Sequence, residues 1–249
     1  MTVEVQQIGA ALVMRLDREA KRNAIDAATT AALDAAMNRL EDDDDLQVGI
    51  VTGGTSVFSA GSDLKVMAGE PTPRGGEYGI IRRTHLKPLI AAVEGLALGG
   101  GMEIVLSCDL VVASRSASFG LPEIKRGLFA VYGGVFRAPR ALPLNIAREV
   151  VLTGDPISAE RAERFGFVNV LCEPGQALDE ALALSARIVA NAPVSVRESL
   201  RVLEASVTAN DEVAWRVNEE ARVAVYASED SREGRQAFLE KRPPVWRGR

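Results

Sequence analysis

Apolar runs recur through the first half of the chain with little polar interruption. Four of them, rich in Val, Ile and Leu, predict buried strands at residues 11–16, 48–52, 89–93 and 110–113. Between the first two runs, Asp26 precedes apolar positions at helical spacing, and the acidic residues 41–45 follow them. An aspartate before such a stripe is a typical N-cap, so we predict a helix there and an α/β arrangement for this half.

Past Pro143 the pattern changes to amphipathic stretches. They predict helices at residues 145–152, 158–165, 177–191, 194–208, 211–227 and 231–240, with one more strand at 167–170. No linker-like segment separates the two halves, so we expect one α/β core over residues 1–192 and a helical oligomerisation region over residues 193–249. The polar segment 71–76 is rich in Pro and Gly, and we interpret it as a mobile surface loop over a site.

Composition narrows the class of protein. With 47% hydrophobic and 25% charged residues among 249, the chain is typical of a globular protein with a large core, which excludes disorder and collagen. A net charge of −5 disfavours a nucleic-acid partner. The longest apolar stretch, residues 89–113, contains charged residues and three consecutive glycines, so we expect it to be buried core and not a membrane span.

The cysteines and the histidine argue against a disulfide framework or a metal site. Cys108 and Cys172 lie far apart in apolar surroundings, which is typical of reduced core thiols. His85 is the only histidine, which disfavours a histidine-based zinc site, and we expect no metal. The first residues show neither a basic leader nor an apolar run, so we expect no secretory signal and a cytoplasmic protein.

A glycine turn, Gly99-Gly100-Gly101, lies between the strand at 89–93 and the helix that follows. Unpaired backbone N–H groups at such a helix start bind anions. Ile104 stands where a dinucleotide fingerprint needs its third glycine, and the Gly-Lys-Ser/Thr of a phosphate loop is absent. Two interpretations stay open: an oxyanion hole, in which an N–H stabilises charge on a carbonyl oxygen, and glycines kept for close helix packing.

A second glycine turn, residues 58–64, follows the strand at 48–52. Its backbone can face the first turn across neighbouring parallel strands, so that two N–H donors converge on one point. We interpret Asp63 in this turn as the N-cap of a helix that begins at Leu64, in preference to a catalytic acid.

Two glutamates stand alone in apolar surroundings. Glu103 lies one turn into the helix after the first glycine turn, and Glu123 lies in the apolar turn 119–124. Glutamate is seldom buried without a function. Burial raises carboxyl pKa values, and two nearby carboxyls push their pKa values apart, which leaves one able to donate a proton and one able to accept it. We therefore predict a general acid/base pair.

Five motifs in this order resemble the enoyl-CoA hydratase (crotonase) superfamily, and the resemblance covers essentially the whole chain. They are residues 22–25 (Arg-Asn-Ala-Ile), 58–64 (Phe-Ser-Ala-Gly-Ser-Asp-Leu), 99–103 (Gly-Gly-Gly-Met-Glu), 119–123 (Phe-Gly-Leu-Pro-Glu) and 238–242 (Phe-Leu-Glu-Lys-Arg). The resemblance implies a crotonase-like spiral of β-β-α units and a C-terminal helical trimerisation region. It implies a homotrimer or a dimer of trimers as the assembly.

The resemblance also implies the parts of the site. The backbone N–H groups of Ser62 and Gly100 would form the oxyanion hole for the thioester carbonyl of an acyl-CoA, and Glu103 and Glu123 would be the catalytic pair. Coenzyme A is then part of the substrate, and no separate cofactor is expected. The positions implied for substrate and coenzyme A binding are Lys21, Arg22, Ala60, Asp63, Leu64, Lys65 and Val131, with Phe238 and Lys241 of an adjacent subunit.

One departure from the hydratase pattern lies at residues 129–132. Where relatives carry a Pro-Gly pair whose glycine N–H helps to hold the water, this chain has Phe-Ala-Val-Tyr. Val131 would then supply the N–H. The bulk of Phe129 and Tyr132 would narrow or reshape the acyl pocket.

The resemblance implies an enoyl-CoA hydratase, a hydro-lyase, and leaves three alternatives open. The closing residues 240–249 and the segment 23–26 are similar to those of carnitinyl-CoA dehydratases. An enoyl-CoA isomerase typically needs one carboxylate, so the retained pair counts against it. A non-catalytic acyl-CoA-binding protein is disfavoured by the same pair.

Overall fold

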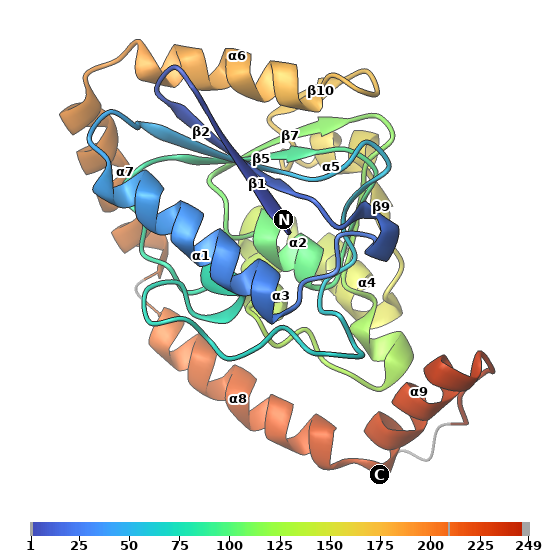
Figure 1. Ribbon diagram of the computed structural model, residues 1–249. Helices are drawn as coiled ribbons and strands as arrows, with labels where there is room; N and C mark the ends of the chain where they lie inside the picture. Colours follow the sequence, from blue (N-terminus) through green and yellow to red (C-terminus); the bar gives the residue numbers. More distant parts are fainter. Residues whose placement is uncertain (1, 209, 246–249) are drawn as a thin grey trace.

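Two β-sheets with surrounding helices make up the computed structural model, which describes residues 2–208 and 210–245 (Figure 1). The larger sheet has the order β1-β2-β3-β5-β7-β10: Val3–Ile8, Ala11–Leu16, Val48–Thr52, Leu89–Val93, Leu110–Ser114 and Val170–Cys172. The smaller sheet has the order β4-β6-β8-β9: Val57–Ser59, Leu96–Leu98, Ser118–Gly120 and Ile157–Ser158. The pairs β1–β2 and β8–β9 are antiparallel, and the other neighbouring strands run parallel.

Successive segments place one strand in each sheet. β3 is followed by β4, β5 by β6 and β7 by β8. This repetition is the spiral of β-β-α units that the resemblance implies, and the predicted fold class is confirmed. Because β4 and β6 are parallel neighbours, the turns that follow them leave the smaller sheet at the same end.

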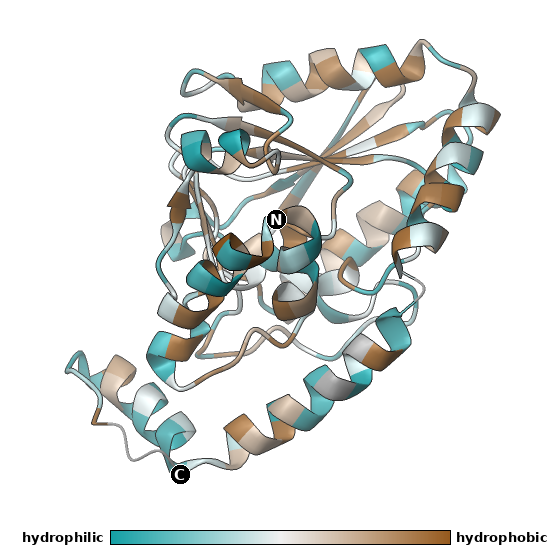
Figure 2. Ribbon diagram, turned by 180° about the vertical axis from the view of Figure 1, so that it is seen from behind, coloured by the Kyte–Doolittle hydropathy of each residue, from teal (hydrophilic) through white to brown (hydrophobic). Residues whose placement is uncertain are grey.

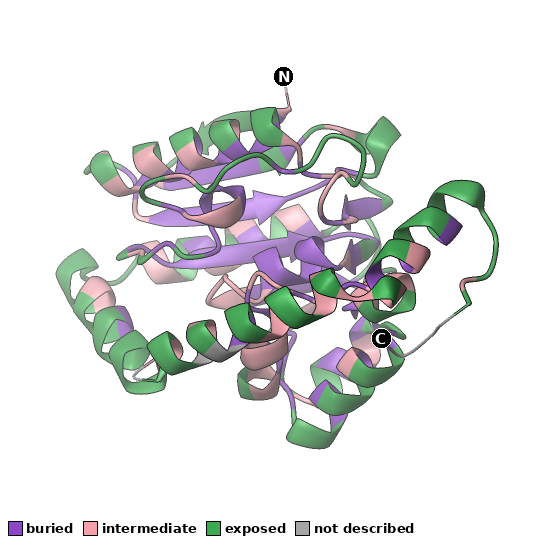
Figure 3. Cartoon of the chain, turned by 90° about the horizontal axis from the view of Figure 1, so that it is seen from below, coloured by how far each residue is buried: buried purple, intermediate pink, exposed green. Residues whose placement is uncertain are grey.

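Helices cover the sheets (Figure 2), and the central strands β3 and β5 are fully buried, as Figure 3 shows for the interior of the larger sheet. α6, Ala177–Val189, packs across β3, β5 and β7 on one face of the larger sheet. α1, Ala27–Asp42, packs on β1, β2 and β3, and α2, Gly100–Val105, packs on β4 and β6. Asp26 caps α1 as predicted, since its side chain accepts a hydrogen bond from the N–H of Thr29.

The remaining helices connect the strands or extend beyond them. The α-helices are α3 (Gly134–Ala141), α4 (Leu144–Thr153), α5 (Ala159–Arg164), α7 (Pro193–Thr208), α8 (Asp211–Ala227) and α9 (Glu229–Glu240). The short 3₁₀ helices are η1 (Glu19–Lys21), η2 (Glu77–Gly79) and η3 (Pro122–Arg126). All six helices predicted past Pro143 are present, with boundaries that differ by at most two residues at either end.

The four predicted strands of the first half are confirmed, whereas the strand predicted at 167–170 is wrong. The chain is extended in β10 at residues 170–172, and Phe167 instead packs its ring edge to face on Phe119 in the core, with centroids 5.1 Å apart. Burial of a loop residue produced the apolar signal there. β1 was missed because this edge strand buries only Val3 and has no apolar run.

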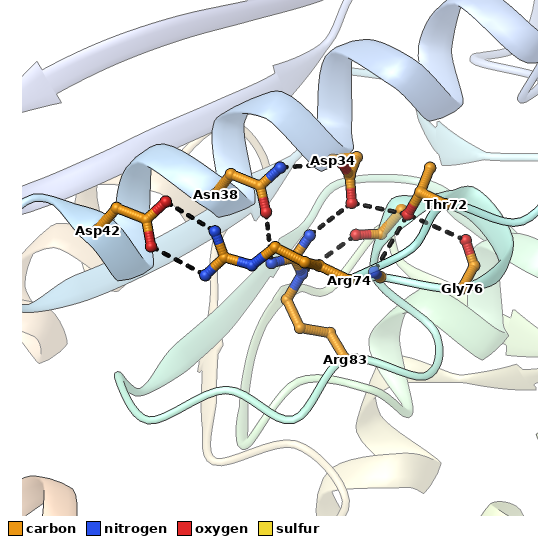
Figure 4. Close-up of polar contacts among 9 residues, drawn as sticks. Asp34, Asn38, Asp42, Thr72, Arg74, Gly76 and Arg83 are labelled. Atoms are coloured by element: carbon orange, nitrogen blue, oxygen red, sulfur yellow. Dashed lines mark hydrogen bonds and ion pairs between the residues drawn. The ribbon is translucent and has the colours of Figure 1, made fainter.

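The segment 71–76 does not lie free over a site, which corrects the interpretation as a mobile loop. The Thr72 hydroxyl donates to Asp34 of α1 (2.7 Å), and Arg74 pairs with Asp42 of the same helix (2.6 Å), as Figure 4 shows. The segment also closes on itself through mutual backbone hydrogen bonds between Thr72 and Gly76. Local composition identified a surface turn correctly and could not show that α1 anchors it.

Both cysteines are free thiols in the structure. Within residues 2–208 and 210–245, no helix is long and apolar enough to cross a membrane, and no cluster of three or more His, Cys, Asp or Glu side chains could hold a metal ion.

α9 packs against η3 of its own chain, which bears on the expected role of the C-terminus. The backbones touch closely, since a Cβ atom placed on Gly234 of α9 would lie 2.1 Å from the carbonyl oxygen of Arg126. The Arg126 guanidinium stacks over the ring of Phe238, 4.7 Å from its centroid. We expected Phe238 and Lys241 to lie near the coenzyme A of an adjacent subunit. The structure shows α9 packed on its own chain, and the contact with an adjacent subunit stays a prediction. The closing residues 246–249 lie outside the described residues.

Candidate active site

The two glycine turns approach each other at the N-terminal end of α2. A Cβ atom placed on Gly61 would lie 2.6 Å from the backbone nitrogen of Gly100. Gly61 also has φ of +84°, a conformation that side-chain-bearing residues rarely adopt. The structure therefore brings the turns together, as the parallel strands before them led us to expect.

The backbone N–H groups of Ser62 and Gly100 are available to a ligand. Gly100 is the first residue of α2, and the first N–H groups of a helix have no partner within it. In the β-bridge between Ser62 and Ile25, the N–H of Ile25 donates to the carbonyl of Gly61, and the N–H of Asp63 donates to the carbonyl of Ile25. The N–H of Ser62 takes no part in this bridge. Neither N–H has a backbone acceptor among the described residues.

Glu103 lies on the first turn of α2, and two backbone N–H groups hold its carboxylate. Oε1 accepts hydrogen bonds from Tyr132 (2.7 Å) and Gly134 (3.0 Å). The side chain is buried. Burial, followed by the charge of Glu123, raises the pKa of Glu103, and the two N–H groups oppose this rise.

Glu123 lies on η3 and borders the same turn of α2. Its Oε1 would lie 3.1 Å from a Cβ atom placed on Gly99, the residue that caps α2. Its Oε2 is buried and has no hydrogen-bond partner among the described residues. Burial raises the pKa of Glu123. The structure thus brings together both glutamates that the sequence singled out.

Tyr78 also belongs to this site, and the sequence analysis missed it. Its side chain is buried, and its hydroxyl lies 2.6 Å from Ser62 Oγ. Its ring packs edge to face on Tyr132, with centroids 4.9 Å apart. A Cβ atom placed on Gly100 would lie 2.1 Å from the Tyr78 hydroxyl. No motif marks Tyr78, because it follows a loop that the tertiary structure folds back onto the glycine turns.

A cavity of about 400 Å³ opens between Leu64 of the second glycine turn and residues of α8 and α9. Leu64 and Phe238, both predicted to bind coenzyme A, lie in its wall. Its wall also contains three arginines that the sequence analysis did not identify, Arg126, Arg232 and Arg235. Guanidinium groups suit phosphate binding. Arg126 is far in sequence from the other two, so only the packing of α9 on η3 could reveal the group.

Several residues predicted to bind coenzyme A lie outside this cavity wall. Lys21, Arg22 and Lys65 are exposed and do not line it. Lys241 ends α9 in a left-handed conformation and does not line it either.

Asp63 and Ala60 have structural contacts. Asp63 begins no helix, which corrects its interpretation as a helix N-cap: its carboxylate accepts from the N–H of Lys65 (3.1 Å) in a turn and lies 3.4 Å from the Arg18 guanidinium. The N–H of Ala60 donates to the carbonyl of Arg22 (3.0 Å), which ties the motif at 22–25 to the second glycine turn.

Two backbone contacts fix the position of residues 129–132. The N–H of Tyr132 donates to Glu103 (2.7 Å), and the carbonyl of Val131 accepts from the Asn218 side chain of α8 (2.7 Å). That the N–H of Val131 helps to hold the water stays a prediction. Phe129 and Tyr132 are half-buried. Asn218 therefore holds this segment from the C-terminal region, a contact that a local motif cannot reveal.

Comparison with known proteins agrees with this geometry. The family model described as enoyl-CoA hydratase/isomerase matches residues 7–249. The chain belongs to this family. The chain is 41% identical to a carnitinyl-CoA dehydratase of Salmonella paratyphi A, over 97% of this chain and 96% of that one.

Solved structures of family members have the same fold. A carnitinyl-CoA hydratase from Mycobacterium avium superposes with a TM-score of 0.95 at 40% identity and covers 100% of this chain and 99% of its own. An enoyl-CoA hydratase from Mycobacterium tuberculosis H37Rv gives a TM-score of 0.80 at 44% identity, again over 100% of this chain and 99% of its own.

Proposed function

We propose that this protein is an enoyl-CoA hydratase, a hydro-lyase that adds water reversibly across the C2–C3 double bond of an enoyl-CoA thioester. The observation that carries the proposal is the pair of buried carboxyls, Glu103 and Glu123, beside the unpartnered N–H groups of Ser62 and Gly100. Relatives at 40–44% identity are named as hydratases and dehydratases, which catalyse one reaction in its two directions.

In this mechanism the thioester oxygen accepts hydrogen bonds from the N–H groups of Ser62 and Gly100. When water attacks C3, the electron pair of the double bond moves toward this oxygen and an enolate forms. Donors aimed at such a developing charge lower the barrier, and one donor is worth about 3–4 kcal/mol in comparable sites. No separate cofactor is needed, because the thioester itself accepts the electron pair.

The two glutamates divide the proton transfers between them. The two N–H groups on Glu103 favour its ionised form, which suits the base that takes a proton from the attacking water. The buried, unpartnered Oε2 of Glu123 favours the protonated form, which suits the acid that delivers a proton to C2. The water is consumed, and proton exchange between the carboxyls and solvent restores the starting state.

The cavity beside the turns is proposed to receive coenzyme A. Leu64, Leu128 and Phe238 give it an apolar wall, and Arg126, Arg232 and Arg235 supply positive charge for phosphates. A thioester whose carbonyl lies between the turns would thus extend its coenzyme A toward α8 and α9.

The test is a kinetic assay with enoyl-CoA thioesters, followed by loss of their conjugated absorbance. We expect the wild type to hydrate the substrate, and Glu103→Gln and Glu123→Gln each to lower kcat by about 10²- to 10⁴-fold with little change in substrate binding. The matched control is Glu180→Gln on α6, which changes a glutamate outside the site. Full turnover in both site variants would refute the mechanism.

A second candidate is carnitinyl-CoA dehydratase, which the names of relatives at 40–41% identity favour. Aromatic side chains attract quaternary ammonium groups. Tyr132, whose N–H donates to Glu103, and Phe129, three residues before it in the chain, are the aromatic candidates. Crotonobetainyl-CoA in the same assay distinguishes the two. A kcat/KM for it well above that for crotonyl-CoA would favour this second candidate.

We also propose assembly as a homotrimer or a dimer of trimers. On α7 and α8, Leu203 is 61% exposed, Val213 54% and Val223 56%, which is unfavourable for aliphatic side chains that face water alone. Two further apolar residues of these helices do not face outward: Leu200 is buried, and Trp215 packs on Phe136 within the chain.

A further inference from the structure

Tyr78 adopts a backbone conformation that is unfavourable for its residue type. Its φ is +56°, in the left-handed region where a bulky side chain is rare. Such a conformation is unfavourable and persists only where the surrounding structure holds it. Strain of this kind concentrates at functional sites, so Tyr78 is a candidate for a role beyond packing.

A polar network centred on Asp34 of α1, shown in Figure 4, fastens the chain on both sides of Tyr78. The Arg83 guanidinium donates to Asp34 (2.5 Å) and to the carbonyl of Gly79, the residue after Tyr78 (3.3 Å). Asp34 also accepts from the Thr72 hydroxyl (2.7 Å). Thr72 and Arg83 are the two ends of the segment 72–83, which carries Tyr78, so both ends of this segment are fastened to α1.

The hydroxyl of Tyr78 lies where the two proposed oxyanion-hole residues meet. It contacts Ser62 Oγ at 2.6 Å, and it would lie 2.1 Å from a Cβ atom on Gly100. Among the described residues, Ser62 Oγ is its one hydrogen-bond partner. A hydroxyl both donates and accepts, so this arrangement uses only half of its capacity.

We propose that the Tyr78 hydroxyl is a third hydrogen-bond donor to the thioester oxygen, beside the N–H groups of Ser62 and Gly100. This inference rests on the proposed function. The Ser62 hydroxyl donates to the Tyr78 oxygen, and the phenolic proton then points to the substrate oxygen. Hydrogen bonds in such a chain strengthen one another, and the donor from Ser62 makes Tyr78 a better donor.

The phenol stays protonated in this site. Burial, followed by the charge of Glu103, raises the pKa of Tyr78 well above its ordinary value, while the hydrogen bond from Ser62 opposes the rise. Tyr78 thus gives a hydrogen bond to the enolate and transfers no proton to it. The transfers remain with the two glutamates.

The test is Tyr78→Phe, which keeps the ring and its packing on Tyr132 and removes the hydroxyl. We expect kcat to fall about 10- to 100-fold with KM changed by less than about threefold, since the donor acts on charge that develops in the transition state. Ser62→Ala keeps the backbone N–H and removes the hydroxyl, and it should lower kcat by less. The double variant should be no slower than Tyr78→Phe, because the two hydroxyls act in one chain.

A direct readout of the oxyanion hole uses a bound β-ketoacyl-CoA, whose enolate absorbs in the near ultraviolet. We expect Tyr78→Phe to lower the enolate fraction at a given pH by about tenfold. Thr52→Val is the matched control. It removes a buried hydrogen bond from the Thr52 hydroxyl to the carbonyl of Ala92 (2.9 Å), which involves no residue of the proposed site, so it should change only the melting temperature.

An unchanged kcat and an unchanged enolate fraction in Tyr78→Phe would overturn the inference. So would a loss of kcat without a loss of enolate, which would indicate a packing role. The proposed function would still stand if Glu103→Gln and Glu123→Gln were inactive. It would fail separately if the wild type hydrated none of the thioesters.

Discussion

Two buried glutamates, Glu94 and Glu103, have the same local chemistry, and we propose different roles for them. Glu94 accepts hydrogen bonds from the N–H groups of Gly175 (2.9 Å) and Ala177 (3.0 Å), as Glu103 does from Tyr132 and Gly134. Glu94 caps the start of α6 on the far side of the larger sheet, whereas Glu103 borders the glycine turns. Burial and hydrogen bonding alone therefore do not identify a catalytic carboxylate, and its neighbours do.

We expect Glu94→Ala to reduce stability and to leave catalysis unchanged. The substitution leaves two N–H groups at the start of α6 without an acceptor, which costs about 1–3 kcal/mol. Urea unfolding would show the loss of stability, and kcat for enoyl-CoA hydration should stay within twofold of the wild type. A large fall in kcat in the folded variant would contradict the structural role.

Glu123→Gln is expected to stabilise the fold at neutral and alkaline pH while it lowers activity. Burial raises the pKa of Glu123 in the folded state, so the folded state binds more protons than the unfolded state from about pH 4.5 up to the folded-state pKa. Stability of the wild type therefore falls as pH rises through that window. Glutamine does not ionise, so the variant does not lose stability in this way as pH rises.

The measurement is the melting temperature of both proteins from pH 4 to pH 9. We expect the variant to melt at least about 2–4 °C above the wild type at pH 8, which is what 1 kcal/mol gives in a chain of this size. The difference should vanish near pH 4. Equal melting temperatures at all pH values would show that the carboxyl is not buried in solution.

At the scale of elements, two kinds of support position the parts of the site. The glycine turns follow the parallel strands β4 and β6, and the pairing of these strands brings the turns together. The segment with Tyr78 has no such support and relies on Asp34 and Arg83. The positions of the turns are therefore a property of the sheet, and the position of Tyr78 is a property of one polar network.

Asp34→Ala should loosen this segment. Arg83 is almost fully buried, and removal of its partner leaves an uncompensated charge, which costs about 3–5 kcal/mol when the pair is fully buried. We expect a lower melting temperature together with a lower kcat. Arg74→Ala is the control on the same segment, because its pair with Asp42 is about half exposed and solvent screens it, so its loss should change the melting temperature little. Equal effects of the two variants would contradict the special role of Asp34.

At the scale of the whole molecule, α9 folds over its own chain and α7 and α8 present apolar side chains outward. The cavity proposed for coenzyme A needs both the turn at Leu64 and the helix with Phe238. Both elements belong to the same chain. The exposed apolar residues of α7 and α8 form the surface at which we propose contact with other subunits.

Leu203→Glu is expected to lower the mass of the assembly. A charge at the centre of an apolar contact between subunits removes the burial that stabilises it and adds a desolvation cost. Sedimentation should show a shift from trimer or hexamer toward monomer. Leu152→Glu is the matched control, because Leu152 on α4 is 71% exposed and lies outside these helices. A wild-type protein that sediments as a monomer would refute the proposed assembly.

The sequence by itself determined the elements that have a strong local pattern. Continuous apolar runs located the central parallel strands, and helical spacing located α1 and the six helices past Pro143, because periodicity records which side of an element is buried. Five ordered motifs pointed to the family. They also pointed to Glu103, Glu123 and both glycine turns, since these residues adjoin strands or begin helices.

Only the tertiary structure decided what residues distant in sequence do together. It placed the Tyr78 hydroxyl against Ser62, gathered Arg126 with Arg232 and Arg235, and fastened the segment 71–76 to α1. It also moved Phe167 from a predicted strand into the core. The physical reason is that a sequence pattern reports how far a residue is buried, whereas its partners depend on which elements pack together, and that packing joins segments far apart in the chain.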